Sequence, residues 1–167
     1  MLEVCKGNYI TCSTYDDATN TDFTTAMTNM NSIMTTPGTG ASGASPQAIL
    51  FIVTDGVEDK KATSCAYSMI NLSGFSRCMQ PFDITTCTTI KNRGIKIAIL
   101  YTEYYPLSSD DFYNQYVAPF QSNIGPNLQS CASSGLFFTV TTSGDISSAM
   151  TTLFKTAVQS VEAHLSN

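Results

Sequence analysis

Ala48-Ile-Leu-Phe-Ile-Val-Thr-Asp55-Gly56 is an apolar run that ends abruptly in a carboxylate and a glycine. Short apolar runs bounded by turn residues are typical of buried strands in parallel sheets. Ligands of open α/β sheets bind outside the carboxyl ends of such strands. Asp55 is therefore a candidate for binding or chemistry, and a plain turn is the alternative because Asp-Gly is a common turn dipeptide.

Apolar periodicity along the rest of the chain predicts an α/β domain. Further strands are expected at residues 95–101 and 136–140, which are almost wholly apolar. Helices are expected at residues 21–35, at 83–92 behind an Asp83 cap, at 110–130 and from an Asp145 cap to about 161. The third of these should break near Pro119 and again at Gly125-Pro126.

Two segments carry weaker signals. Residues 1–20 are expected to form a separate leading segment with short strands at 2–4 and 9–11. Residues 55–82 read as a polar, cysteine-bearing excursion between the first strand and the following helix. A strand, a helix and a further strand form a right-handed parallel crossover by default.

Composition and charge narrow the classes of function. The 167 residues have 43% hydrophobic content, which suits one domain with a sizeable core. The formal net charge is -5, and the eight Lys and Arg residues form no basic stripe, so nucleic acid is excluded as an expected partner. The low charged fraction and abundant Thr, Ser and Asn favour an envelope or secreted protein.

Six cysteines lack the Cys-x-x-Cys spacing of zinc sites; they are Cys5, Cys12, Cys65, Cys78, Cys87 and Cys131. Disulfides and an oxidising compartment are the favoured interpretation, and six buried free thiols are the alternative. Fifteen connectivities are open. Cys65 with Cys78, like Cys5 with Cys12, needs only a local loop, whereas Cys87 and Cys131 would have to meet through the fold.

The sequence contains neither an apolar window long enough for a membrane helix nor the apolar region of a signal peptide. If the disulfides exist, the chain is expected to be a piece of a longer exported protein.

The Thr-Asp-Gly strand end and the preceding stretch Thr21-Asp22-Phe-Thr-Thr-Ala26-Met27 resemble the von Willebrand factor A domain. The resemblance implies a Rossmann-like, open, mostly parallel sheet with flanking helices over residues 21–167. It also places Thr21 and Asp55 in a metal-ion-dependent adhesion site. Hydroxyl and carboxylate oxygens suit Mg²⁺, whose open position would accept an acidic group from a partner.

The second half resembles the C-terminal region of TadG-like proteins of the bacterial tight-adherence pilus system. The blocks that carry this resemblance are Arg77-Cys-Met-Gln-Pro81, residues 87–107, Tyr116-Val-Ala-Pro-Phe120, Leu128-Gln-Ser-Cys-Ala132 and Asp145-Ile-Ser-Ser-Ala-Met150. The resemblance implies an extracytoplasmic protein of the bacterial envelope, held to the membrane through an N-terminal anchor and binding proteins of the pilus machinery.

The family's principal metal motif, Asp-x-Ser-x-Ser, has no match in residues 1–20. The chain is therefore expected to be an N-terminally truncated domain in which Thr21 and Asp55 form half a site. Such a half site should hold Mg²⁺ poorly, while the full-length parent would bind it. The strand at 48–54 would then have an open apolar edge, so we expect poor solubility for the chain alone.

The function expected from these features is a non-catalytic adhesion or assembly domain. Tyr104 and Tyr105, with Asp22 and Glu58, are candidates for an interaction surface, and packing is the alternative for the tyrosines. A metal-free envelope scaffold is a second possibility. A phosphate-handling hydrolase using Asp55 is a third, but it has Val53 where a nucleophilic aspartate would be needed.

Overall fold

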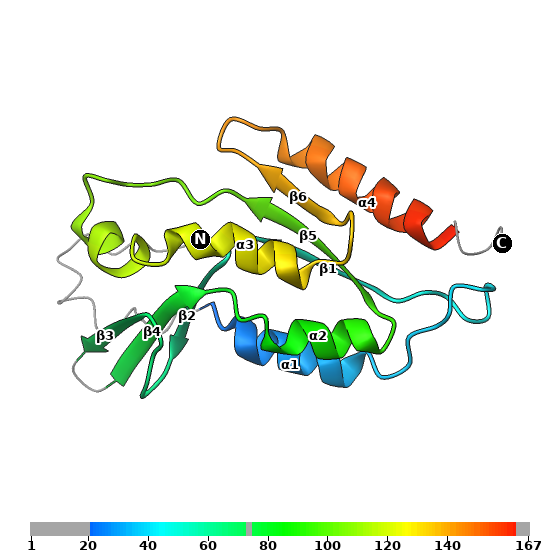
Figure 1. Ribbon diagram of the computed structural model, residues 1–167, viewed down its shortest axis with the longest axis horizontal. Coiled ribbons are helices and arrows are strands. Elements are labelled where there is room, and N and C mark those ends of the chain that lie inside the picture. The colour runs from blue at the N-terminus through cyan, green and yellow to red at the C-terminus, as the bar shows by residue number, and fades with distance from the viewer. Residues whose placement is uncertain (1–20, 73–74, 163–167) are drawn as a thin grey trace.

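The computed structural model describes residues 21–72 and 75–162, which form a mixed α/β fold (Figure 1). The expected leading segment, with its short strands and with Cys5 and Cys12, lies outside the described residues. The same holds for the last five residues of the expected domain.

A parallel sheet contains the three strands expected from the apolar runs. They are β1 (Ile49–Thr54), β5 (Lys96–Thr102) and β6 (Phe137–Val140), in the order β1-β5-β6. Both pairings are parallel. The apolar β5 lies in the middle, where residues 97–100 are completely buried, as expected for a strand covered on both faces.

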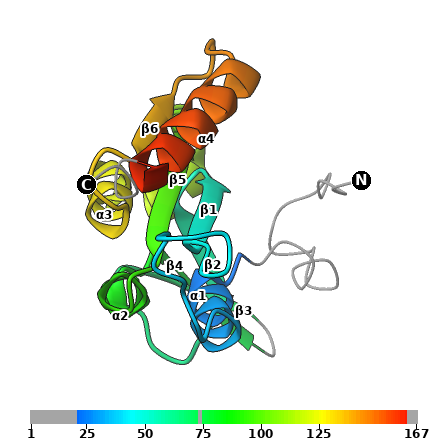
Figure 2. The ribbon, with the colours of Figure 1, turned by 90° about the vertical axis from the view of Figure 1, so that its right-hand side faces the viewer.

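Helices cover both faces of this sheet. They are α1 (Phe23–Ile33), α2 (Thr85–Asn92), α3 (Gln121–Cys131) and α4 (Ile146–Glu162), with a π-helical turn η3 (Tyr113–Val117) before α3. Ile97 and Ile99 pack in one core with α1, α2 and α3, whereas Ala98 and Leu100 pack in another with α4. Figure 2 shows α3 and α4 on opposite sides of the strands. This division follows from the alternation of side chains along a strand.

Residues 57–81, expected as a polar excursion, form a second sheet of three antiparallel strands. They are β2 (Val57–Lys61), β3 (Ser68–Leu72) and β4 (Phe75–Pro81), in the order β2-β4-β3. This sheet was not predicted from the sequence because its strands contain buried charged residues, namely Glu58, Asp59 and Arg77. The Arg77 guanidinium donates two hydrogen bonds to the Asp59 carboxylate, Nε to Oδ1 at 2.9 Å and Nη2 to Oδ2.

Aspartate carboxylates accept hydrogen bonds near the start of three helices, and caps were expected at two of them, Asp83 and Asp145. The Asp22 carboxylate accepts from the Thr25 amide at 2.8 Å, and Asp145 accepts from the Ser148 amide at 3.1 Å. Asp83 accepts from the Thr85 amide at 2.8 Å, but the N-cap of α2 is Ile84, so the expected Asp83 cap lies one residue too early.

The helical stretch at 110–130 breaks near Pro119 as expected, but the second expected break is wrong. Pro126 lies inside α3, which continues to Cys131. A proline removes one backbone hydrogen bond from a helix. The buried face of α3, formed by Ile124, Leu128 and Cys131, favours the helix despite this loss.

Two disulfides connect the cysteines of the described residues. Cys65 is bonded to Cys78 of β4, and Cys87 of α2 is bonded to Cys131 of α3. The disulfide interpretation is confirmed for these four residues. No helix among the described residues is both long enough and apolar enough to cross a membrane.

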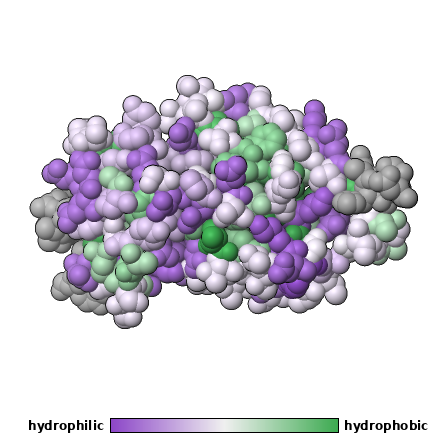
Figure 3. Space-filling view, viewed as in Figure 1, coloured by the Kyte–Doolittle hydropathy of each residue, from purple (hydrophilic) through white to green (hydrophobic). Residues whose placement is uncertain are grey.

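The β1 strand lies at one edge of the parallel sheet. Within the described residues its only strand partner is β5. Val53 is 50% exposed, which is unusual for an apolar residue in a parallel strand. Elsewhere polar side chains cover most of the face drawn in Figure 3, interrupted by small apolar patches.

Candidate binding site at the carboxyl edge of the parallel sheet

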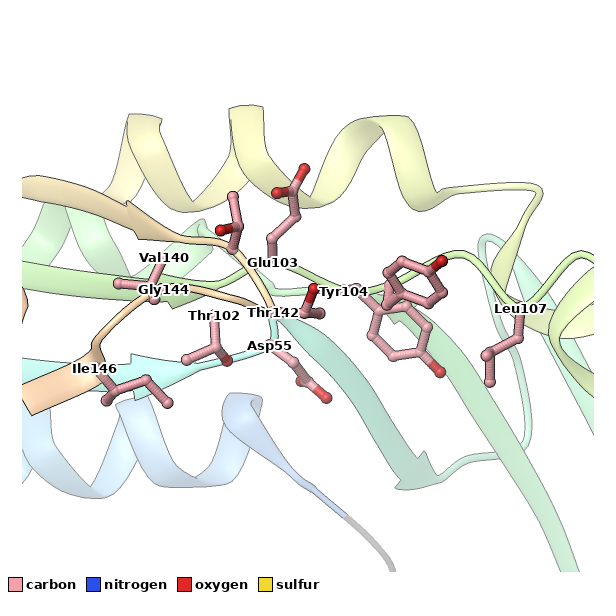
Figure 4. Close-up of a pocket in the computed structure, with 11 residues that line it drawn as sticks. Asp55, Thr102, Glu103, Tyr104, Leu107, Val140, Thr142, Gly144 and Ile146 are labelled. Carbon is pink, nitrogen blue, oxygen red and sulfur yellow. The ribbon is translucent and has the colours of Figure 1, made fainter.

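The three parallel strands end at the same edge of the sheet, and the segments that follow them enclose a cavity. Its volume is about 330 Å³. Asp55 follows β1, and residues 103–105 follow β5. Residues 141–145 connect β6 to α4, whose first residue, Ile146, also lines the cavity (Figure 4). This is the edge where open α/β sheets bind ligands.

Asp55 is held in a tight turn as well as at the cavity. Its Oδ1 accepts a hydrogen bond from the Val57 amide at 3.1 Å, and the Thr54 hydroxyl accepts from the Gly56 amide at 2.9 Å. Gly56 has a φ of 77°, and a Cβ there would lie 2.5 Å from Ile124 Cγ2 of α3. Only glycine suits that conformation and contact. Asp55-Gly56 therefore forms a turn, and Asp55 also lines the cavity.

The charge of Asp55 acts on the tyrosines beside it. Desolvation raises the pKa of the Asp55 carboxyl, and hydrogen bonds from backbone amides oppose the rise only in part. Burial also raises the pKa of Tyr101 and of Tyr104. Negative charges raise both further, those of Glu103 and Asp55 for Tyr101 and those of Asp55 and Asp110 for Tyr104. The electrostatic environment at this edge is therefore negative.

Tyr104 is fixed in place by neighbours outside the cavity. Its ring stacks on Tyr113 with ring centroids 6.2 Å apart and an interplanar angle of 14°. The Gln121 side chain accepts a hydrogen bond from the Tyr113 hydroxyl and donates to the Tyr104 carbonyl at 3.1 Å. The aromatic side of the cavity is thus held rigidly by η3 and α3.

The rim of the cavity is apolar and open to solvent. Tyr105 is 62% exposed, Leu107 48% and Ile146 50%. Exposed apolar and aromatic side chains around a concave surface are typical of sites that contact other molecules.

The other residues expected at the site are placed elsewhere. The Thr21 carbonyl accepts a hydrogen bond from the Asp59 amide at 3.0 Å, and Thr21 does not line the cavity. Asp22 is exposed and serves as the N-cap of α1.

Glu58 is completely buried, so its assignment to an interaction surface is wrong. Its carboxylate accepts from the Thr24 amide and hydroxyl, both at 2.7 Å, and from the Gln80 amide group. Lys60 Nζ lies 3.2 Å from its other oxygen. Glu58 thus satisfies an otherwise unpaired amide at the start of α1 and joins that helix to the antiparallel sheet.

The donors at this edge do not fit a magnesium site. Among the described residues, no three His, Cys, Asp or Glu side chains are grouped so that they could hold a metal. One oxygen of Asp55 already accepts a hydrogen bond from the Val57 amide, and the threonine hydroxyls that could act as neutral ligands are those of Thr102, Thr141 and Thr142. Mg²⁺ needs a near-octahedral set of oxygens, which these side chains do not provide.

Sequence reasoning missed several residues of the cavity, namely Thr102, Glu103, Thr142 and Ile146. Thr102, Glu103 and Thr142 lie at or just beyond the end of an expected parallel strand, whereas Ile146 is the first residue of α4. The rule that singled out Asp55, applied to the ends of all three strands, would have found the first three of these residues but not Ile146.

No family model matches the chain, no curated protein matches it, and no solved structure matches it.

Proposed function

We propose that this chain is a non-catalytic adhesion or assembly domain of a bacterial tight-adherence pilus system. It acts in the extracytoplasmic part of the envelope through protein contacts at the carboxyl edge of its parallel sheet. The single observation that carries the proposal is the open cavity with its exposed apolar rim of Tyr105, Leu107 and Ile146.

Three further features support this proposal. The sequence blocks that resemble TadG-like proteins include the carboxyl end of β5 and the start of α4, and both of these border the cavity. The α/β fold with three parallel strands is compatible with a von Willebrand factor A-like domain. The two disulfides suit an oxidising compartment.

The proposal is tested by measuring binding of the purified chain to purified pili and pilus assembly proteins from a bacterium with a tight-adherence system. Tyr105→Ser with Leu107→Ser should weaken binding at least tenfold, because central aromatic and apolar side chains contribute most to interface energy. Biolayer interferometry gives the affinities.

Ile33→Ser is the matched control, because Ile33 is 72% exposed on α1 and does not line the cavity. It should leave the affinity within about twofold, as expected for an apolar residue outside an interface. Absence of binding to every pilus protein tested, or an equal loss in the control, would overturn the proposal.

A further inference from the structure

The charged side chains that line the cavity are all acidic. Asp55 and Glu103 line it, and no Lys, Arg or His is among the described residues that do. In Figure 4 the two carboxylates point to different sides, so they do not share one site. Of these two, Asp55 is the acid whose negative charge, together with that of Asp110, raises the pKa of Tyr104 beyond the effect of burial.

Asp55 also has unused capacity for a hydrogen-bonding cation. Its Oδ1 accepts from the Val57 amide, but no protein cation pairs with the carboxylate among the described residues. A partly desolvated carboxylate without a counter-ion favours a positive ligand, because pairing offsets the cost of desolvation.

The aromatic residues beside Asp55 suit the same kind of ligand. Tyr104 is held by its stacking on Tyr113, so little ordering would be needed on binding. Tyr105 adds a second, exposed ring to the rim. The face of a tyrosine ring attracts ammonium and guanidinium groups, and a nearby carboxylate strengthens that preference.

We infer that the cavity binds a cationic side chain, lysine or arginine, from a partner protein. The Asp55 carboxylate serves as the counter-ion, and the rings of Tyr104 and Tyr105 contact the cation and its alkyl stem. The inference rests on the proposed function, since it names the chemistry of the partner at the same edge. It requires no metal, and it predicts a basic partner group where a metal-dependent adhesion site would select an acidic one.

The test is an NMR titration of the ¹⁵N-labelled chain with N-acetyl-lysine methylamide and with N-acetyl-arginine methylamide. Saturable shifts are expected at the amides of Asp55, Thr102 and Tyr104 for at least one of the probes. The neutral norleucine analogue should bind at least fivefold more weakly, because it lacks the charge. Raising the salt concentration should weaken only the cationic probes.

Two variants locate the interaction. Asp55→Asn should weaken cation binding about five- to tenfold. Asp111→Asn removes an exposed carboxylate that does not line the cavity and should leave the affinity unchanged. Tyr105→Leu changes an exposed side chain, so it preserves the fold and should weaken binding about threefold, whereas Tyr105→Phe should not.

Equal binding of the norleucine analogue, or binding of acetate only when Mg²⁺ is added, would overturn the inference. So would pilus-protein binding that Tyr105→Ser with Leu107→Ser abolishes but Asp55→Asn leaves unchanged. Conversely, cation binding without any pilus-protein binding would refute the proposed function and leave the chemistry of the cavity standing.

Discussion

The two sheets of this molecule are built on opposite principles. The parallel sheet is almost entirely apolar, and its central strand β5 is buried on both faces. The antiparallel sheet buries a glutamate, an aspartate and an arginine among its strands. The first depends on removal of apolar surface from water, and the second depends on the pairing of every buried charge.

This difference has a consequence for how each sheet tolerates change. Apolar side chains in a core are replaceable by others of similar volume at modest cost. A buried charge is specific to its partner, because removal of one member leaves the other unpaired in a desolvated site. The antiparallel sheet should therefore be the more sensitive of the two to single polar substitutions.

The largest expected effect comes from the disulfides, of which each region has one. Cys87→Ala with Cys131→Ala removes a link across 44 residues and should lower the free energy of unfolding by about 4 kcal/mol. Cys65→Ala with Cys78→Ala removes a link across 13 residues and should lower it by about 3 kcal/mol. Urea denaturation of the two variants measures both values, and a reversed order would show that strain or residual structure outweighs loop length.

A smaller effect is expected from the buried ion pair of the antiparallel sheet. Arg77→Met should lower the free energy of unfolding by about 3 kcal/mol, because it leaves the buried Asp59 carboxylate without its guanidinium. Combining Arg77→Met with Asp59→Leu should recover most of this loss, as both charges are then absent.

Lys155→Met is the control for this pair, since Lys155 is exposed on α4. It should change the free energy of unfolding by less than about 0.5 kcal/mol in the same urea experiment. A double variant as unstable as Arg77→Met alone would argue that the shape of the pair, rather than its charge, stabilises the sheet.

The smallest expected effect lies at the carboxyl edge of the parallel sheet. The pKa of Asp55 is raised in the folded chain, so folding favours its protonated form. Stability should therefore fall as pH rises from the ordinary carboxyl pKa of about 3.9 through the raised folded value. Asp55→Asn removes this penalty and should melt slightly higher than the wild type at pH 7.

Thermal unfolding followed by circular dichroism at several pH values checks this prediction. The difference between Asp55→Asn and the wild type should vanish below about pH 2.5, where the carboxyl is protonated in both states. A difference that persists there would mean that the substitution acts through packing or the turn to Val57 instead.

The parallel sheet and its helices could be predicted from the sequence because local signals agree there with the fold. β1, β5 and β6 are apolar runs, and Asp145 caps α4 where its position indicated. The antiparallel sheet could not be predicted. Glu58 and Asp59 lie among lysines in β2, and only tertiary pairing with Gln80 and Arg77 makes their burial favourable.

The candidate site was predicted only in part, for a similar reason. Asp55 was predicted as a site residue because it directly follows an apolar strand. Ile146 begins α4 and comes to the cavity only because the β6–α4 connection returns to the same edge. Thr21 was placed beside Asp55 by resemblance alone, and its backbone instead pairs with Asp59.

The Cys87–Cys131 bond also determines how the chain would carry a mechanical load. The covalent loop it closes contains all of β5 and all of α3. A pull on the two ends of the chain would pass through the sulfur atoms and bypass the central strand. The segment between the two cysteines, which are 44 positions apart in the sequence, is about 150 Å long when fully extended and would bear no tension. Under tension the most buried strand of the molecule could not be drawn out while this bond is intact.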